Sequence, residues 1–103
     1  MNELFEEVDV IVSPGSPRGA QRSDVPESIV VLRILGQSFT GYWNMTGHPA
    51  LTLPIGFTAD GVPLSMQVAA RPFDEALALR VGDAYQRATD WHLRVPPLLL
   101  QAR

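Results

Sequence analysis

Cysteine and lysine are both missing from this sequence of 103 residues. Without cysteine, the chain cannot form a disulfide framework, a thiolate metal site or a cysteine nucleophile. All eight basic residues are arginine, so no side chain can serve as an amine base, a Schiff-base lysine or the lysine of a phosphate-binding loop. These two absences exclude several classes of catalytic site before any motif is considered.

Charge is also scarce, since charged residues make up 18% of the chain and the net charge is -3. No basic stripe is present, so we expect no direct contact with nucleic acid. The first residues are acidic and followed by a very short apolar run, which fits neither a secretory signal nor a membrane span. We therefore expect a cytoplasmic protein with no membrane partner.

Hydrophobic residues make up 46% of the chain, which is typical of a globular domain. Residues 2–8 read as the end of a helix, and the β-branched run 9–12 predicts a strand that enters a proline-rich loop. The apolar stretch 27–35 favours a short helix over a strand. The glycines and aromatic rings of residues 36–47 predict a loop that packs against neighbouring structure.

The second half has clearer patterns. Residues 50–53 and 64–70 predict two strands of a hairpin, joined by a turn at 59–61. Apolar side chains at helical spacing predict a helix over 74–89 with Asp74 as its N-cap, and residues 93–103 should form an extended tail. The second strand should carry its apolar residues on one face and its polar residues on the other. The apolar face is Leu64, Met66 and Val68, the polar face is Ser65 and Gln67, and the helix face is Leu77, Val81, Ala84, Tyr85 and Ala88.

About three strands and one clear amphipathic helix are too few to cover a sheet on both faces. The edges of such a sheet would stay open, and open edges pair readily with other strands. We therefore expect a part of a larger sheet or a protein with an obligate partner, with self-association through the exposed edges as a further route.

The sequence offers little for metal or acid–base chemistry. His48 and His92 have no cysteine or carboxylate at ligand spacing, so we expect no metal site and no cofactor. His48 should hydrogen-bond within a tight loop, and His92 should lie at the last turn of the helix. The adjacent carboxylates Asp74 and Glu75 are better suited to stabilising a helix start than to paired acid–base work.

The order of short motifs resembles the C-terminal segment of the amidase signature family, which includes the glutaminase subunit of the tRNA-dependent amidotransferase. The similarity covers nearly the whole chain, and the spacing from Thr40 to His92 is its most specific part. The matching motifs are Asp9–Pro14, Phe39–Thr40, Asn44–Ala50, Pro54–Phe57, Gly61–Leu64, Gln67, Arg71–Glu75, Leu79–Val81 and Ala88–His92.

This resemblance implies the C-terminal portion of an α/β/α fold with a mixed central sheet and flanking helices, of which residues 1–103 would hold about three strands and two to three helices. The family cleaves amide bonds with a nucleophilic serine, a bridging serine and a lysine base. Neither a lysine nor a Gly-Gly-Ser-Ser stretch occurs here, so we expect no catalytic residue in this chain. The motif residues Asn44, Gly47, Pro49, Pro54 and Gly56 should be structural.

Two residues are expected near a substrate pocket, Gln37 and Trp43. In the glutaminase subunits, the position matching Gln37 carries an acidic residue that holds the ammonium group of glutamine. A neutral amide cannot supply that charge-assisted contact, which favours a general amidase. The stretch 71–92 nevertheless looks especially like the glutaminase subunit, so both substrate classes stay open.

Three hypotheses follow for the chain as a whole. The first is a truncated amidase, because Met1 falls where a family member would be in mid-domain. The second is a non-catalytic subunit that completes a split amidase by docking an open sheet edge onto the chain that carries the serines and the lysine. The third is a small independent binding module that uses Tyr42 and Trp43 as its contact surface.

Overall fold

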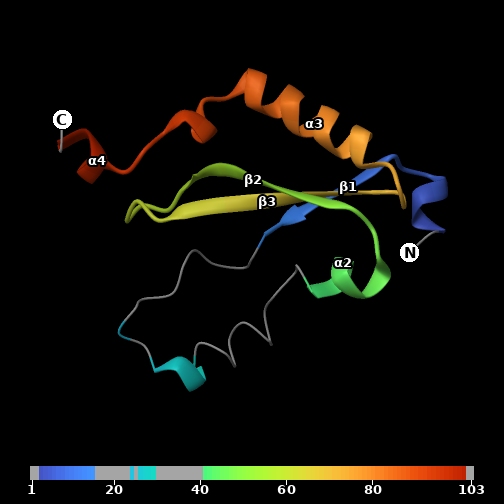
Figure 1. The fold of residues 1–103 in the computed structure, drawn as a ribbon, viewed down its shortest axis with the longest axis horizontal. Coiled ribbons are helices and arrows are strands. Elements are labelled where there is room, and N and C mark those ends of the chain that lie inside the picture. Colours follow the sequence, from blue (N-terminus) through green and yellow to red (C-terminus); the bar gives the residue numbers. More distant parts are fainter. Residues whose placement is uncertain (1–2, 16–23, 25, 30–40, 102–103) are drawn as a thin grey trace.

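The computed structural model describes residues 3–15, 24, 26–29 and 41–101. A three-stranded sheet lies at its centre, with helix α3 packed on one face (Figure 1). The α/β class and the expected three strands are confirmed, and every described strand pairing is antiparallel. The elements in chain order are η1 (Leu4–Glu6), β1 (Val10–Pro14), α2 (Gly41–Thr46), β2 (Ala50–Phe57), β3 (Pro63–Ala70), α3 (Glu75–Ala88), η2 (Trp91–Leu93) and α4 (Pro97–Gln101).

The predicted hairpin is confirmed, and its first strand is longer than expected, because β2 continues through Pro54 to Phe57. Its turn is closed by the amide of Gly61, which donates to the carbonyl of Thr58 at 2.9 Å. Gly61 has φ of 85°, a conformation that glycine adopts without a steric penalty. The turn therefore depends on the glycine that the sequence analysis used to place it.

Strand β3 lies between the other two, in the order β1-β3-β2. Val10 pairs with Ala70 across β1 and β3, and Ala50 pairs with Ala69 across β2 and β3. The last four residues of β3 are all buried, and Val68, Ala69 and Ala70 have no exposed surface. The central strand thus holds more of the described buried residues than any other element.

The prediction of a polar, wetter face on β3 is wrong. Gln67 is only 2% exposed, and its side-chain amide lies 3.5 Å from the carbonyl oxygen of Pro14, to which it donates. Gln67 lies on the same face of β3 as Ala69, which packs with Phe5 and Trp43. A buried amide needs hydrogen-bond partners. The polar residue here forms part of the interior.

Helix α3 confirms the helix predicted over residues 74–89 and packs against β2 and β3. Its buried residues are Ala78 and Gly82. A Cβ atom placed on Gly82 would lie 2.5 Å from Cδ2 of Leu51, so the missing side chain lets the helix approach the sheet closely. Asp74 is the N-cap residue, as predicted, but its side chain makes no capping hydrogen bond; its carbonyl accepts from the amides of Leu77 and Ala78.

The N-terminal residues form a 3-10 turn, η1, before β1. The guanidinium group of Arg71 fixes this turn to the end of β3. Its Nη2 atom donates to the carbonyl of Phe5 at 2.6 Å and to that of Val8 at 2.9 Å, and its Nε atom also donates to Phe5 at 3.0 Å. An ion pair with Asp9 at 3.3 Å completes the contacts. We call this group the Arg71 clamp.

The loop predicted over residues 36–47 contains helix α2 in its described part. The helix ends at Gly47, whose amide donates to the carbonyl of Trp43 at 3.0 Å and whose φ of 76° is the left-handed conformation typical of a helix C-terminus. Residues 27–29 are helical, as predicted for 27–35, while residues 30–40 lie outside the described part of the chain.

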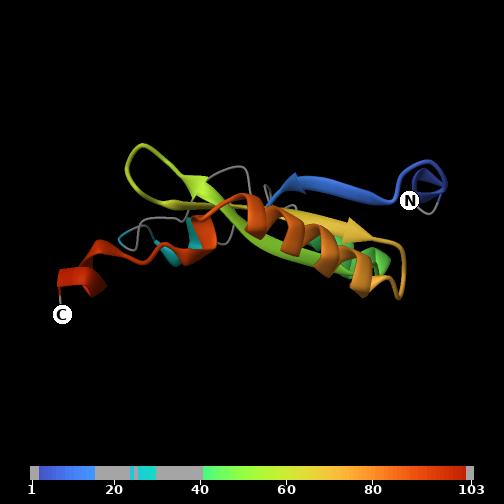
Figure 2. The same ribbon diagram turned by 90° about the horizontal axis from the view of Figure 1, so that it is seen from above.

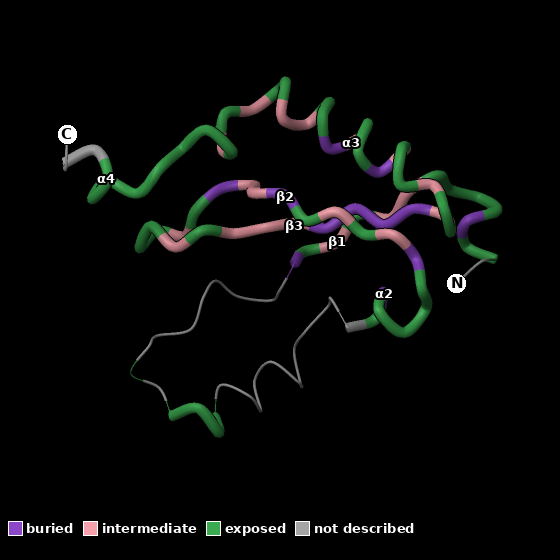
Figure 3. The backbone as a smooth tube through the Cα atoms, in the orientation of Figure 1, coloured by how far each residue is buried: buried purple, intermediate pink, exposed green. Residues whose placement is uncertain are grey.

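The tail expected to be extended over residues 93–103 contains the short helix α4, which begins at Pro97. Proline suits the first position of a helix because its fixed φ is helical and its missing N-H has no intrahelical acceptor there. Figure 3 shows the part of this tail over residues 93–99 as exposed, in contrast to the buried centre of the sheet. Among the described residues, no helix is both long enough and apolar enough to cross a membrane.

Candidate functional site

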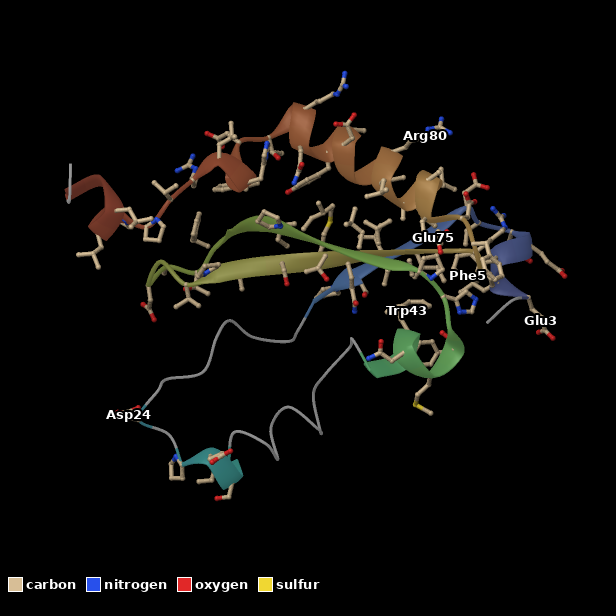
Figure 4. The ribbon with its side chains drawn as sticks, viewed as in Figure 1. Glu3, Phe5, Asp24, Trp43, Glu75 and Arg80 are labelled. Carbon is tan, nitrogen blue, oxygen red and sulfur yellow. The ribbon has the colours of Figure 1, made fainter. Side chains whose placement is uncertain are left out.

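Trp43, expected near a substrate pocket, belongs to a buried aromatic cluster formed by Phe5, Trp43 and His48. The side chain of Trp43 points from α2 toward the sheet, as Figure 4 shows, and only 7% of it is exposed. It packs with Phe5 and Ala69, and Ile11 is packed against the same group. The cluster joins η1, α2 and the face of the sheet opposite α3.

The imidazole of His48 lies between two aromatic rings. It stacks on Phe5 with 5.1 Å between ring centroids and an interplanar angle of 26°, and it meets Trp43 edge-on at 5.8 Å and 76°. His48 is 8% exposed. This packing assigns the histidine a place in the core, directly after the glycine that ends α2.

Two of the motif residues follow members of the aromatic cluster in the sequence, Asn44 after Trp43 and Pro49 after His48. The carbonyl of Pro49 accepts the amide of Ala70 at 3.0 Å, which starts the β2–β3 ladder, while Asn44 is exposed on α2. Gln37 lies outside the described residues, so its partnership with Trp43 in a substrate pocket stays a prediction. What the structure describes at Trp43 is a packing role.

A second site was not predicted from the sequence. An open groove of about 630 Å³ lies between the β2–β3 hairpin and the C-terminal tail, on the side where Phe57 and Trp91 meet. Their ring centroids are 6.0 Å apart at 66°, an edge-to-face arrangement. The motif residue Pro54 lines this groove, and Gly56, with φ of 149°, lies beneath the Trp91 ring. The other principal lining residues are Pro63, Arg94 and Pro96.

Polar groups are few in this groove. The guanidinium carbon of Arg94 sits 4.9 Å from the centre of the Trp91 ring, and its Nη2 atom lies 3.4 Å from both carboxylate oxygens of Asp90. The guanidinium charge of Arg94 therefore interacts both with the Asp90 carboxylate and with the face of the Trp91 ring. His92 also lines the groove and forms part of η2 rather than the last turn of α3.

No described group of side chains forms a catalytic constellation. Within the described ranges, no cluster of three histidine or acidic residues is arranged to hold a metal ion. The hydroxyl of Ser65 lies against the Cα of Gly15, where a Cβ atom would collide with it. No lysine exists anywhere in the sequence to activate such a hydroxyl.

The curated relatives are much longer than this chain. A glutamyl-tRNA(Gln) amidotransferase subunit from Chloroflexus aggregans is 45% identical over 97 residues, covering 94% of this chain and 20% of the relative. A protein of the same name from Roseiflexus castenholzii is 44% identical over 94 residues, covering 91% of this chain and 19% of its own length. An amidase from Pseudomonas putida is 38% identical over 103 residues, covering 94% of this chain and 22% of its own length.

The chain thus spans about one fifth of the length of the relatives it matches. The sequence model of the family described as Amidase matches residues 1–79, which is more than half of the chain. The matched region contains η1, the whole described sheet, α2 and the first residues of α3. This chain belongs to the amidase family.

Proposed function

We propose that this chain forms the C-terminal part of an amidase domain that hydrolyses amide C-N bonds, and that it contributes structure rather than catalytic groups. The observation that carries the proposal is the absence of lysine from a chain that belongs to the amidase family. In the Ser-Ser-Lys mechanism that the resemblance implies, an uncharged lysine accepts the proton of the nucleophile through the bridging serine. Without such a base, a serine hydroxyl stays an ordinary alcohol at neutral pH.

The geometry of the described residues supports a structural contribution. The aromatic cluster packs η1 and α2 against one face of the sheet, and α3 covers part of the other. The motif glycines and prolines serve turns, strand ends and close contacts. Each of these features shapes the scaffold, and none places a nucleophile beside a base.

A direct assay tests the absence of catalysis. The purified chain is incubated with aliphatic amides, aryl amides and glutamine, and released ammonia or amine is measured over time. We expect no release above the buffer rate. Turnover that survives repurification and scales with chain concentration would refute the proposal.

Complementation tests whether the chain contributes structure to an amidase domain. The Chloroflexus aggregans relative, with the residues that match this chain deleted, is co-expressed with this chain carrying an affinity tag. We expect the two to purify together and amidase activity to reappear. Failure of the tagged chain to recover any of the truncated relative would contradict the proposed role.

A second substrate class is favoured by the relatives themselves, since those at 45% and 44% identity are named as subunits of an amidotransferase. Gln37 argues for a general amidase, because it supplies no charge to an ammonium group. Comparing glutamine with simple amides in the complemented enzyme separates the two. Replacing Gln37 by Glu should raise glutamine turnover relative to simple amides if that position faces the substrate.

A further inference from the structure

The two outer strands of the sheet differ in what their free edges offer to another strand. Because β3 is central, β1 and β2 each have one edge without a described strand beside it. An open edge presents backbone N-H and C=O groups that can pair with an added strand. The hydrogen-bond pattern identifies which residues carry these groups.

On β1, the residues that face outward are Val10 and Val12. The amide of Gly15 donates to the carbonyl of Ser65 at 3.0 Å, so Gly15 is bonded toward β3. In an antiparallel pair, the backbone N-H and C=O groups of successive residues point alternately toward and away from the partner strand. Ser13 and Ile11, two and four residues before Gly15, therefore also point toward β3. The N-H groups of Val10 and Val12 point away from β3.

On β2, the same reasoning places Thr52 and Pro54 at the outer edge. The amide of Ala70 donates to the carbonyl of Pro49 at 3.0 Å, so the alternate residues Leu51 and Leu53 are bonded to β3. Pro54 has no N-H to offer at its outward position. A register shift follows between Pro54 and Gly56, which further interrupts this edge.

The C-terminal segment also packs against β2. Helix η2 contacts this strand, and the Trp91 ring lies 3.9 Å from where a Cβ of Gly56 would be. The outer edge of β2 is therefore interrupted by a proline and by a register shift. Proteins use these same features to prevent further strand pairing.

The β1 edge shares one of these features, because Pro14 also lies at an outward position and offers no N-H, but no register shift interrupts the pairing of β1 with β3. Val10, Ile11, Val12 and Ser13 are uncharged, and Val12 is 56% exposed although it lies in a strand beside the core. Val12 pairs with Val68, which pairs with Leu51, so Val12 is on the face that α3 covers. Figure 2 shows α3 lying over β2 and β3 with β1 to one side, in agreement with the exposure of Val12.

We infer that the outer edge of β1 is where the rest of an amidase domain adds its next β-strand, and that the edge of β2 is a true end of the sheet. The inference rests on the proposed function, and the occupant is a strand from the four fifths of the relatives' length that this chain does not cover. That strand pairs with the outward groups of Val10 and Val12. Its own segment of the domain covers the bare side chain of Val12.

Two matched proline variants test this. Val12→Pro removes one outward N-H from β1, and Thr52→Pro removes one outward N-H from β2, while neither removes a donor to β3. Each tagged variant is co-expressed with the Chloroflexus aggregans relative lacking its matching residues, and the recovered complex is quantified. We expect Val12→Pro to reduce recovery at least tenfold and Thr52→Pro to leave it within twofold of the parent.

A second pair keeps the test independent of proline strain. Val12→Lys and Thr52→Lys each place a charge at an outer edge without altering backbone donors. We expect Val12→Lys to reduce recovery of the complex and Thr52→Lys to leave it unchanged. Thermal unfolding of each variant alone, followed by circular dichroism, should show a similar midpoint within each pair.

The outcomes separate the inference from the proposed function. If the parent chain recovers no truncated relative, the proposed function fails and the inference falls with it. If recovery depends on Thr52 and not on Val12, the inference is wrong while the proposed function stands. A parent chain that dimerises in sedimentation analysis, and becomes monomeric with Val12→Pro, would assign the edge to a second copy and overturn the inference. Selective loss of stability in Val12→Pro alone would mean that the edge is already paired within this chain, which also overturns it.

Discussion

Replacing Arg71 by Met should be among the most destabilising single changes in the described part of the chain. Methionine keeps much of the aliphatic stem but removes every hydrogen bond of the Arg71 clamp. Two carbonyl groups, those of Phe5 and Val8, lose a charged donor at distances of 2.6 and 2.9 Å. Phe5 is also 3% exposed and stacks on His48, so the change acts at the edge of the aromatic cluster.

The magnitude follows from the kind of hydrogen bond. A bond to a charged group is worth about 1.5–3 kcal/mol when well shielded, and the clamp makes such bonds to two carbonyls. The side chain of Arg71 is 39% exposed, so water competes for these donors. We therefore expect a loss of about 2–3 kcal/mol, well below the sum of two shielded bonds. In a chain of this size the unfolding midpoint should fall by roughly 10–20 °C.

Thermal unfolding monitored by circular dichroism measures the effect, and Asp9→Asn is the matched control. The Asp9 carboxylate is 82% exposed, so its ion pair with Arg71 should contribute less than about 1 kcal/mol. Arg71→Lys should recover only part of the loss, because an ammonium group cannot reproduce the planar set of donors. If Asp9→Asn were as destabilising as Arg71→Met, the stabilisation would come from the ion pair, and the reasoning from the carbonyl groups would be refuted.

Two further predictions concern backbone conformation. Gly15→Ala should destabilise the chain by about 1–3 kcal/mol, because the new Cβ would collide with the hydroxyl of Ser65. Adding Ser65→Ala should restore part of this loss in a double-mutant unfolding experiment. An undiminished loss in the double variant would contradict this. Phe73 has φ of 65° and is 95% exposed. Phe73→Asn should therefore raise stability by about 0.5 kcal/mol, since asparagine tolerates the left-handed conformation and no buried contact is lost; an unchanged or lower midpoint would count against strain at this position.

The hairpin and α3 could be predicted from the sequence because their signals are local. Asp60-Gly61 marks a turn, and the apolar spacing of residues 77–88 has the period of a helix. Asp74 was correctly placed as the N-cap residue, but its side chain makes no capping bond, because residue type indicates only that a side chain can cap, not that it does. At Asp74, where φ is -102° and ψ is 43°, the carbonyl group rather than the side chain bonds to the first turn of the helix.

The errors in the interior have a different origin. Alternating polar residues in β3 suggest a strand with one face toward solvent, whereas Gln67 is buried on the face where Ala69 packs with Phe5 and Trp43. That packing brings together segments far apart in the sequence, which no local pattern reveals. The short helix α2 was missed because Gly41, Asn44 and Thr46 have low helix propensity.

The groove at Phe57 and Trp91 could not be located from spacing alone. These residues are far apart in the sequence, and their rings meet only because β2 bends at Gly56 and η2 returns to it. The glycine and the aromatic residues were visible in the sequence, but their juxtaposition was not. The aromatic character of residues 36–47 correctly predicted packing at Trp43, for which the structure supplies the partners Phe5 and His48, whereas Tyr42 is exposed and residues 36–40 are outside the described part of the chain.

The strand order also constrains how the polypeptide acquires its shape during synthesis. Val10 pairs with Ala70, so β1 must wait for β3, some sixty residues later, before it gains a neighbour in the described sheet. Until then the β-branched residues of β1 remain exposed apolar surface that can associate with other chains. In contrast, β2 and β3 can pair around their tight turn as soon as both are synthesised. Delayed translation between residues 14 and 63 would lengthen that exposure and favour aggregation.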